Sequence, residues 1–254
     1  MNELVHYAVD RAIATVTLDS PDNRNALSAR LVGEVSAHLQ TAAADGAVRA
    51  VVLTHTGTTF CSGADLKESA AEGGPAQGTL RMLAMLRVII ELPKPVIARI
   101  DGNVRAGGLG IVGACDVAVA GPTSSFAFTE VRLGLAPAII SLTTLGRMSE
   151  RAAARYYLTG EKFDAATAAA TGLITAAVQD LDAEIAAIAD ALRACSPQGL
   201  AETKPLTTRA TLAAFEQRAE QVQAQSARLF SSDEAREGMT AFLQRRPPSW
   251  APSE

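Results

Sequence analysis

Two glycine-containing turns in this chain could stabilise negative charge on a substrate oxygen. The turn at Gly107-Gly108 follows an apolar run at residues 95–100 that is typical of a buried strand in a parallel sheet. Glycine permits positive φ and a close backbone approach to a ligand, and the first amides of a helix have no intrahelical partner. Such amides can donate to a developing oxyanion, although a tight turn packed against a neighbouring strand needs the same glycines.

A second turn of the same kind lies upstream. Residues 50–54 are an apolar run, and residues 57–68 then turn through Gly63 into an expected helix start. Two such turns in one chain favour a paired oxyanion site over an isolated tight turn.

Length, composition and charge limit the class of protein. The chain has 254 residues, of which 48% are apolar and 4% aromatic, and this favours an α/β or helix-rich fold with a substantial core. Its net charge of −4 argues against nucleic acid as the main partner. Because no apolar run approaches the ~20 residues of a membrane span and no signal peptide is visible, we expect a cytoplasmic protein without membrane contact.

The three cysteines have no metal-binding spacing, so no metal site is expected. We expect Cys61, Cys115 and Cys195 to be reduced thiols. Cys61 lies in the first turn, where packing is a better explanation than a role as nucleophile.

The order of apolar and helical patterns predicts a largely parallel sheet with right-handed crossovers. Residues 69–78 are small and polar with a Gly-Pro break, which is typical of a mobile loop beside a substrate pocket. The other expected elements are a hairpin at residues 5–9 and 13–18, a helix that Ser28 caps and that runs to about Ala44, a helix at residues 80–92, a helix from Ile139 toward Met148, and helices from about Asp180 with breaks near Pro197 and Ser231.

Together the two turns resemble the crotonase (enoyl-CoA hydratase/isomerase) superfamily. The first is similar to the family's Phe-x-x-Gly-Ala-Asp-Leu-Lys-like motif, and the second to its glycine-rich turn before a helix ending in Cys-Asp. Further matches are Pro21, Asn25, Ala26 and Leu27 in one loop, and Leu158, Thr159, Gly160, Ala169, Gly172 and Leu173 downstream.

This resemblance implies a specific α/β fold and acyl-CoA chemistry. Residues 1–195 are expected to form a spiral of ββα units, and residues 196–254 a helical region that makes trimer contacts and helps cover the CoA. The assembly would be a homotrimer or a hexameric dimer of trimers. The substrate would be an acyl-CoA thioester of fatty-acid or lipid metabolism, with CoA as part of the substrate and no separate cofactor.

The resemblance also assigns the binding residues. The oxyanion amides would be those of Ala64 and Gly107, and the CoA would be held by Arg24, Ala64, Asp65, Leu66, Lys67 and Gly107. Arg24 could equally be a solvated loop arginine, and Asp65 is better explained as a helix cap. Lys204, Arg245 and Arg246 could meet CoA phosphates or be surface charges.

Glu130 is the expected proton-transfer group. It matches the second of two glutamates that the family's hydratases use, whereas the position of the first is Gly110. Apolar neighbours on both sides of Glu130 would raise its pKa and suit it to proton transfer, although a solvated charge or an ion pair with Arg132 is the structural alternative. At Gly110, water, another side chain or a larger substrate would have to fill the space of the missing carboxylate.

Two other polar residues lie close to the second turn. Arg105 could enter the acyl pocket and pair with a polar acyl group or with Glu130, or it could face a subunit interface or solvent. Asp116 is expected to have a structural role, bonding nearby backbone amides.

The resulting function is that of an enoyl-CoA hydratase-like enzyme with a single glutamate. Δ3,Δ2-enoyl-CoA isomerase is the alternative, because isomerases resemble this chain in keeping only the second glutamate. A CoA-binding homologue with little catalysis is a third.

Overall fold

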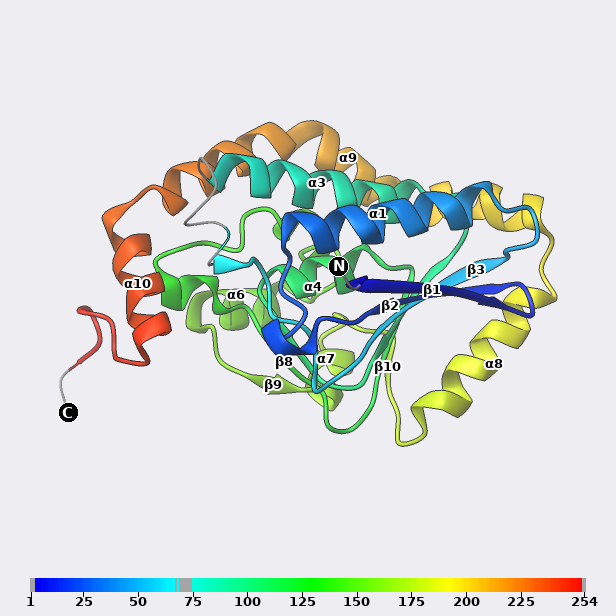
Figure 1. Cartoon of the computed structure of the whole chain (residues 1–254), viewed down its shortest axis with the longest axis horizontal. Helices are drawn as coiled ribbons and strands as arrows, with labels where there is room; N and C mark the ends of the chain where they lie inside the picture. The colour runs from blue at the N-terminus through cyan, green and yellow to red at the C-terminus, as the bar shows by residue number, and fades with distance from the viewer. Residues whose placement is uncertain (1–2, 67, 69–74, 253–254) are drawn as a thin grey trace.

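The computed structural model describes residues 3–66, 68 and 75–252 and shows the expected α/β fold (Figure 1). The large sheet has six strands in the order β1 (Val5–Asp10), β2 (Ile13–Leu18), β3 (Ala50–His55), β5 (Val96–Ile100), β7 (Val117–Ala120) and β10 (Ala176–Ala177). The small sheet has four, in the order β4 (Thr59–Cys61), β6 (Asn103–Arg105), β8 (Ser125–Ala127) and β9 (Phe163–Asp164). The β1–β2 and β8–β9 pairs are antiparallel and the others parallel.

The two sheets are built by a repeated turn of the chain. Strands β3, β5 and β7 of the large sheet are each followed by a strand of the small sheet, namely β4, β6 and β8. Helices α3 (Pro75–Glu91) and α4 (Gly107–Ala114) then return the chain to the large sheet. This confirms the expected ββα spiral. The boundary at residue 195 stays a prediction, and the long helix α9 begins beside it at Pro197.

Helices cover both faces of the large sheet. In Figure 1, α1 (Ala29–Ala44) and α3 lie on one side with α9 (Pro197–Phe230) against α3, and α8 (Leu181–Arg193) lies on the other. The remaining helices are η1 (Pro21–Asn23), η2 (Thr129–Leu133), α5 (Ser141–Thr144), α6 (Glu150–Thr159), α7 (Ala165–Ala170) and α10 (Asp233–Gln244). Although α9 has 34 residues, no helix in the described part of the chain is long and apolar enough to cross a membrane.

Most of the expected helices and strands are confirmed, and a side-chain cap explains where α1 begins. The Ser28 hydroxyl accepts the Leu31 amide at 3.2 Å and starts α1 as predicted. Two expectations were wrong. Residues 75–78 belong to α3 rather than to a loop, and the helix expected from Ile139 to Met148 is reduced to the single turn α5. Residues 69–74 of the expected loop lie outside the described residues.

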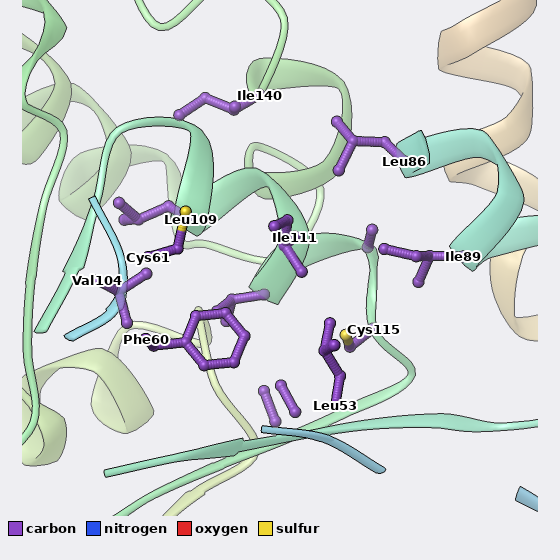
Figure 2. Close-up of a cluster of buried hydrophobic side chains, with 14 of the residues drawn as sticks. Leu53, Phe60, Cys61, Leu86, Ile89, Val104, Leu109, Ile111, Cys115 and Ile140 are labelled. Atoms are coloured by element: carbon purple, nitrogen blue, oxygen red, sulfur yellow. The ribbon is translucent and has the colours of Figure 1, made fainter. Parts of the chain in front are cut away.

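The core between the large sheet, α3 and α4 is apolar and includes two cysteines (Figure 2). Leu53, Phe60 and Leu86 are fully buried there, and burial of such a side chain contributes about 1.5–3 kcal/mol. Burial raises the pKa of the Cys61 and Cys115 thiols to about 12. Both are therefore protonated near neutral pH and act as packing groups, as expected for Cys61.

A buried ion pair attaches α9 to the spiral. The Lys204 ammonium lies 2.8 Å from an Asp116 carboxylate oxygen and also donates to the carbonyls of Ile89 and Lys94. The same Asp116 oxygen accepts the Val96 amide at 2.7 Å, which confirms the expected structural role of Asp116. Burial lowers the pKa of Lys204 and the Asp116 carboxylate partly offsets this. Lys204 is thus a buried structural lysine, so both alternatives for it, a contact with CoA phosphates and a surface charge, were wrong.

Removal of the Lys204 charge is expected to destabilise the fold strongly. In Lys204→Met, Asp116 and two carbonyls lose their buried cation, so we expect unfolding in urea to show a loss of about 3–5 kcal/mol. The control is Arg87→Ala, which breaks the exposed Arg87–Glu91 pair and should cost less than about 1 kcal/mol. A Lys204→Met loss no greater than that of the control would contradict the structural role.

Candidate active site

Three neighbouring parallel strands of the small sheet end beside one another, and the predicted site residues follow these ends. Gly63 and Ala64 follow β4, Gly107 follows β6, and Glu130 follows β8. The register pairs Cys61 with Val104 and Arg105 with Ala127, so the three strands finish within one residue of one another. The carboxyl edge of a parallel sheet is the usual place for a ligand crevice. The fold therefore brings the three sequence-predicted groups to one edge.

The two glycine turns are in direct contact. Gly63 has φ +90°, and a Cβ atom added to it would lie 2.8 Å from Ala106 Cβ and 3.3 Å from Gly107 N. Only glycine fits both the backbone angle and the space. The next residue, Ala64, forms a parallel bridge with Leu27, whose amide donates to the Gly63 carbonyl at 2.8 Å. The backbones that carry the Ala64 and Gly107 amides are thereby held together.

Glu130 has no ion-pair partner among the described residues. Its Oε2 atom is buried and has no hydrogen-bond partner there, although the residue as a whole keeps some exposed surface. Burial raises the pKa of this carboxyl group from its ordinary 4.5 to about 7. Arg132 donates instead to the Thr159 carbonyl at 3.2 Å, so the alternative of a Glu130–Arg132 pair was wrong. A carboxyl group poised near pH 7 is suited to accept and return a proton.

Apolar side chains occupy the place of a second carboxylate. A Cβ atom added to Gly110 would lie 2.5 Å from Ile140 Cγ2 and 3.0 Å from Met82 Cε. Met82 Cε would also lie 3.6 Å from a Cβ atom added to Gly107. Water, another side chain or a larger substrate was expected to occupy this space. The structure places side chains there, Met82 from α3 and Ile140 from the segment before α5.

Comparison with known proteins places the chain in a family. The family model described as Enoyl-CoA hydratase/isomerase matches residues 8–253. The chain belongs to the enoyl-CoA hydratase/isomerase family. This membership confirms the resemblance to the crotonase superfamily and makes the chain an enzyme of that family.

Solved structures and a curated relative agree with this membership. A crystal structure of an enoyl-CoA hydratase from Mycobacterium avium is 56% identical, with a TM-score of 0.92, and the match covers 99% of this chain and 100% of that one. Carnitinyl-CoA hydratase from the same species is 27% identical with a TM-score of 0.86, covering 98% and 99%. Mevalonyl-coenzyme A hydratase of Aspergillus fumigatus is 31% identical over 95% of this chain and 92% of its own length.

In this family member the Arg105 guanidinium does not face Glu130. It donates to the carbonyls of Val104 and Ser125, to the Ser125 hydroxyl and to Asn103 Oδ1, at 2.6–2.9 Å. Partial burial lowers its pKa. Arg105 therefore braces β6 against β8, and the suggested pairing with Glu130 was wrong.

Of the predicted CoA-binding residues that the structure describes, Arg24 lies in the loop before the first turn, Ala64, Asp65 and Leu66 follow Gly63, and Gly107 begins α4. Arg24 is exposed, and its carbonyl accepts the Ser62 amide at 3.1 Å. Asn25 is buried and donates to the carbonyls of Thr56 and Thr59 at 3.2 and 2.7 Å, so it fixes this loop to the turn.

The segment after Ala64 begins as expected. Asp65 Oδ1 accepts the Glu68 amide at 3.2 Å, the geometry of a helix cap, and Leu66 is half-buried. Lys67 lies outside the described residues. At the other end of the chain, Arg245 and Arg246 are exposed, as expected for surface charges; Arg246 pairs with Glu237 at 2.7 Å and the backbone of Arg245 caps α10. Their contact with CoA phosphates stays a prediction.

Sequence reasoning missed three side chains around the site. The Tyr157 ring lies 4.3 Å from that of Phe128, and the Tyr157 hydroxyl bonds to that of Thr144. Burial raises the pKa of Tyr157, and the nearby Glu130 carboxylate raises it further. Met82 and Ile140 flank Gly110. Their helical or apolar patterns only indicated core positions, so no local signal could have assigned them to the site. Two open surface hollows of about 440 Å³ lie elsewhere, one lined by residues of α8 and one beside Ser125.

Packing at Gly110 predicts the effect of adding a single methyl group. Gly110→Ala places Cβ 2.5 Å from Ile140 Cγ2, so we expect a loss of about 1–3 kcal/mol in the free energy of unfolding. Gly33→Ala in α1 is the matched control, because nothing lies within 4 Å of its added Cβ and alanine favours a helix by about 1 kcal/mol. Chemical denaturation measures both. Equal stability changes in the two variants would contradict the packing at Gly110.

The raised pKa of Glu130 predicts a pH-dependent stability. Between pH 4.5 and about 7 the folded protein keeps a proton that the unfolded chain releases, so the free energy of unfolding falls as pH rises through this window. Glu130→Gln has no such proton to lose. We expect the Tm of the wild type minus that of the variant to be higher at pH 5 than at pH 8. An equal difference at both pH values would show that the pKa is not raised.

Proposed function

We propose that this chain is an enoyl-CoA hydratase-like enzyme that works through a stabilised thioester enolate with one glutamate. The amides of Ala64 and Gly107 would receive the thioester oxygen, and Glu130 would transfer the proton. The observation that carries the proposal is the buried Glu130 Oε2, which has no hydrogen-bond partner in the described part of the chain and lies at the same sheet edge as the two glycine turns.

The physical argument rests on where charge develops. Formation of an enolate moves negative charge onto the thioester oxygen, and each of two preorganised amides stabilises it by about 2.7–4 kcal/mol. Glu130 would accept the substrate proton and return it, which a pKa of about 7 allows in both directions near neutral pH. Family membership and the relatives' names, among them enoyl-CoA, carnitinyl-CoA and mevalonyl-coenzyme A hydratases, support a CoA thioester as substrate.

Binding and assembly follow the family resemblance and are part of the proposal. Arg24, Asp65, Leu66 and Lys67 would hold the CoA along the first turn, with no further cofactor. The protein would act in the cytoplasm as a homotrimer or dimer of trimers.

The wall that Met82 and Ile140 form supports a second candidate, Δ3,Δ2-enoyl-CoA isomerase. Hydration needs a water molecule that is oriented for attack, and two apolar side chains beside Gly110 provide no group to orient it. Double-bond migration needs only removal and return of a proton, which one carboxylate can perform. A homologue with little catalysis is less well supported, since a buried carboxylate without a partner costs stability and suggests a use.

An assay of the wild type on paired substrates distinguishes the candidates. Initial rates are compared for hydration of crotonyl-CoA and longer 2-enoyl-CoAs and for isomerisation of the matching 3-enoyl-CoAs. Faster hydration supports the hydratase, and faster isomerisation the isomerase. If no substrate reacts faster than it does in buffer without the enzyme, but acyl-CoA binds tightly, the result supports a CoA-binding homologue with little catalysis. Gly110→Glu is not a clean test, because its side chain would collide with Ile140.

Replacement of Glu130 predicts loss of whichever activity the assay finds. Glu130→Gln keeps the size of the side chain but cannot exchange the proton, so we expect kcat to fall about 10²–10⁴-fold with acyl-CoA affinity little changed. The control is Glu150→Gln, an exposed residue at the start of α6, which should keep full activity. Retention of more than about a third of wild-type kcat in Glu130→Gln, against the loss expected for a general acid–base group, would rule out the assignment.

A further inference from the structure

Ala106 has a backbone conformation that L-amino acids avoid. Its φ is 46° and its ψ −120°, at the residue directly before Gly107. A methyl group is crowded by the backbone in this region, which glycine enters freely. Such outliers persist only where the surrounding structure enforces them, and they gather at functional sites.

The start of α4 lacks the side-chain cap with which several other helices begin, and unlike α5 and α6, which also lack one, α4 follows a residue with positive φ. Helices α1, α7, α9 and α10 follow Ser28, Asp164, Ser196 and Ser232, each with negative φ and a side chain that accepts a first-turn amide. Ala106 has no side chain that could accept one. The first amides of α4 are therefore not capped by the residue at this position, and they can serve a ligand.

Two backbone hydrogen bonds and one side-chain contact hold Ala106 in place. Its amide donates to the Ala127 carbonyl at 3.2 Å, at the end of β8, and its carbonyl accepts the Leu109 amide at 2.9 Å. Its methyl group faces Gly63, where an added Cβ would be only 2.8 Å away. Because ψ of Ala106 orients the peptide plane that contains the Gly107 N–H, this conformation decides where that amide points.

We propose that Ala106 is a positioning residue whose strained backbone aims the Gly107 amide and whose methyl group holds the Gly63–Ala64 segment against it. This inference rests on the proposed oxyanion role of the two amides. The strained backbone of Ala106 fixes the direction of the Gly107 amide, and the absence of a side-chain cap leaves that amide available. Together they keep the Ala64 and Gly107 amides directed at one point before substrate binds.

The test is Ala106→Gly, which removes both the methyl group and the conformational penalty. We expect kcat to fall at least about tenfold with KM changed less than about twofold, because aligned amides act mainly on the transition state. We expect the Tm to rise by about 2–4 °C, since glycine adopts positive φ without strain. Ala106→Ser keeps the Cβ atom and should retain more than half of the wild-type kcat.

Ala12→Gly is the matched control. Ala12 is also an alanine with positive φ, 66°, and it lies in the turn between β1 and β2, away from the candidate site. We expect this variant to gain thermal stability and keep full activity. Unchanged kcat in Ala106→Gly, as in Ala12→Gly, would overturn the proposal.

A readout independent of catalysis separates this inference from the proposed function. Hydrogen–deuterium exchange followed by mass spectrometry reports on peptides that cover residues 104–112. We expect these amides to exchange at least about tenfold faster in Ala106→Gly and at the wild-type rate in Ala12→Gly. Unchanged exchange would overturn the positioning role even if the enzyme is active. A wild type that binds acyl-CoA without turnover would instead overturn the proposed function.

Discussion

The parallel pairing of β4, β6 and β8 is the constraint on which the rest of the site depends. Parallel strands end on the same edge, so three segments that are distant along the chain deliver their following residues to one place. Each strand is short, and none could hold its turn alone. Arg105 adds to the pairing by bonding β6 to Ser125 in β8, and the loop that contains Asn25 secures the end of β4.

Burial then gives the edge its chemical character. Oε2 of Glu130 has lost contact with water without gaining a hydrogen-bond partner among the described residues, and its pKa rises because the charged form is disfavoured. At Gly110, Ile140 and Met82 leave no space even for a methyl group. At the position of the first glutamate of the family's hydratases, packing as well as sequence therefore excludes a carboxylate.

The helical C-terminal region is anchored to the segment that carries the second turn. Lys204 of α9 pairs with Asp116, which follows α4 and also accepts the amide of Val96, the first residue of β5. One buried cluster therefore connects α9 to β5 and to the end of α4. A buried pair of this kind gains little energy over apolar packing, but loss of one partner is costly. It therefore ties the placement of α9 to that of the turn.

Local patterns in the sequence were enough to predict most of the elements and the motifs. Helix caps such as Ser28, apolar periodicity and proline stops are local signals, and they predicted most helices and strands, while the two glycine turns and Glu130 carried the resemblance to the family. Tertiary structure decided what each group contacts. The burial of Lys204, the lack of a partner for Glu130 and the wall that Met82 and Ile140 form all depend on residues far apart in the chain. No local pattern encodes such contacts, because they exist only after the strands have paired and the helices have packed over them.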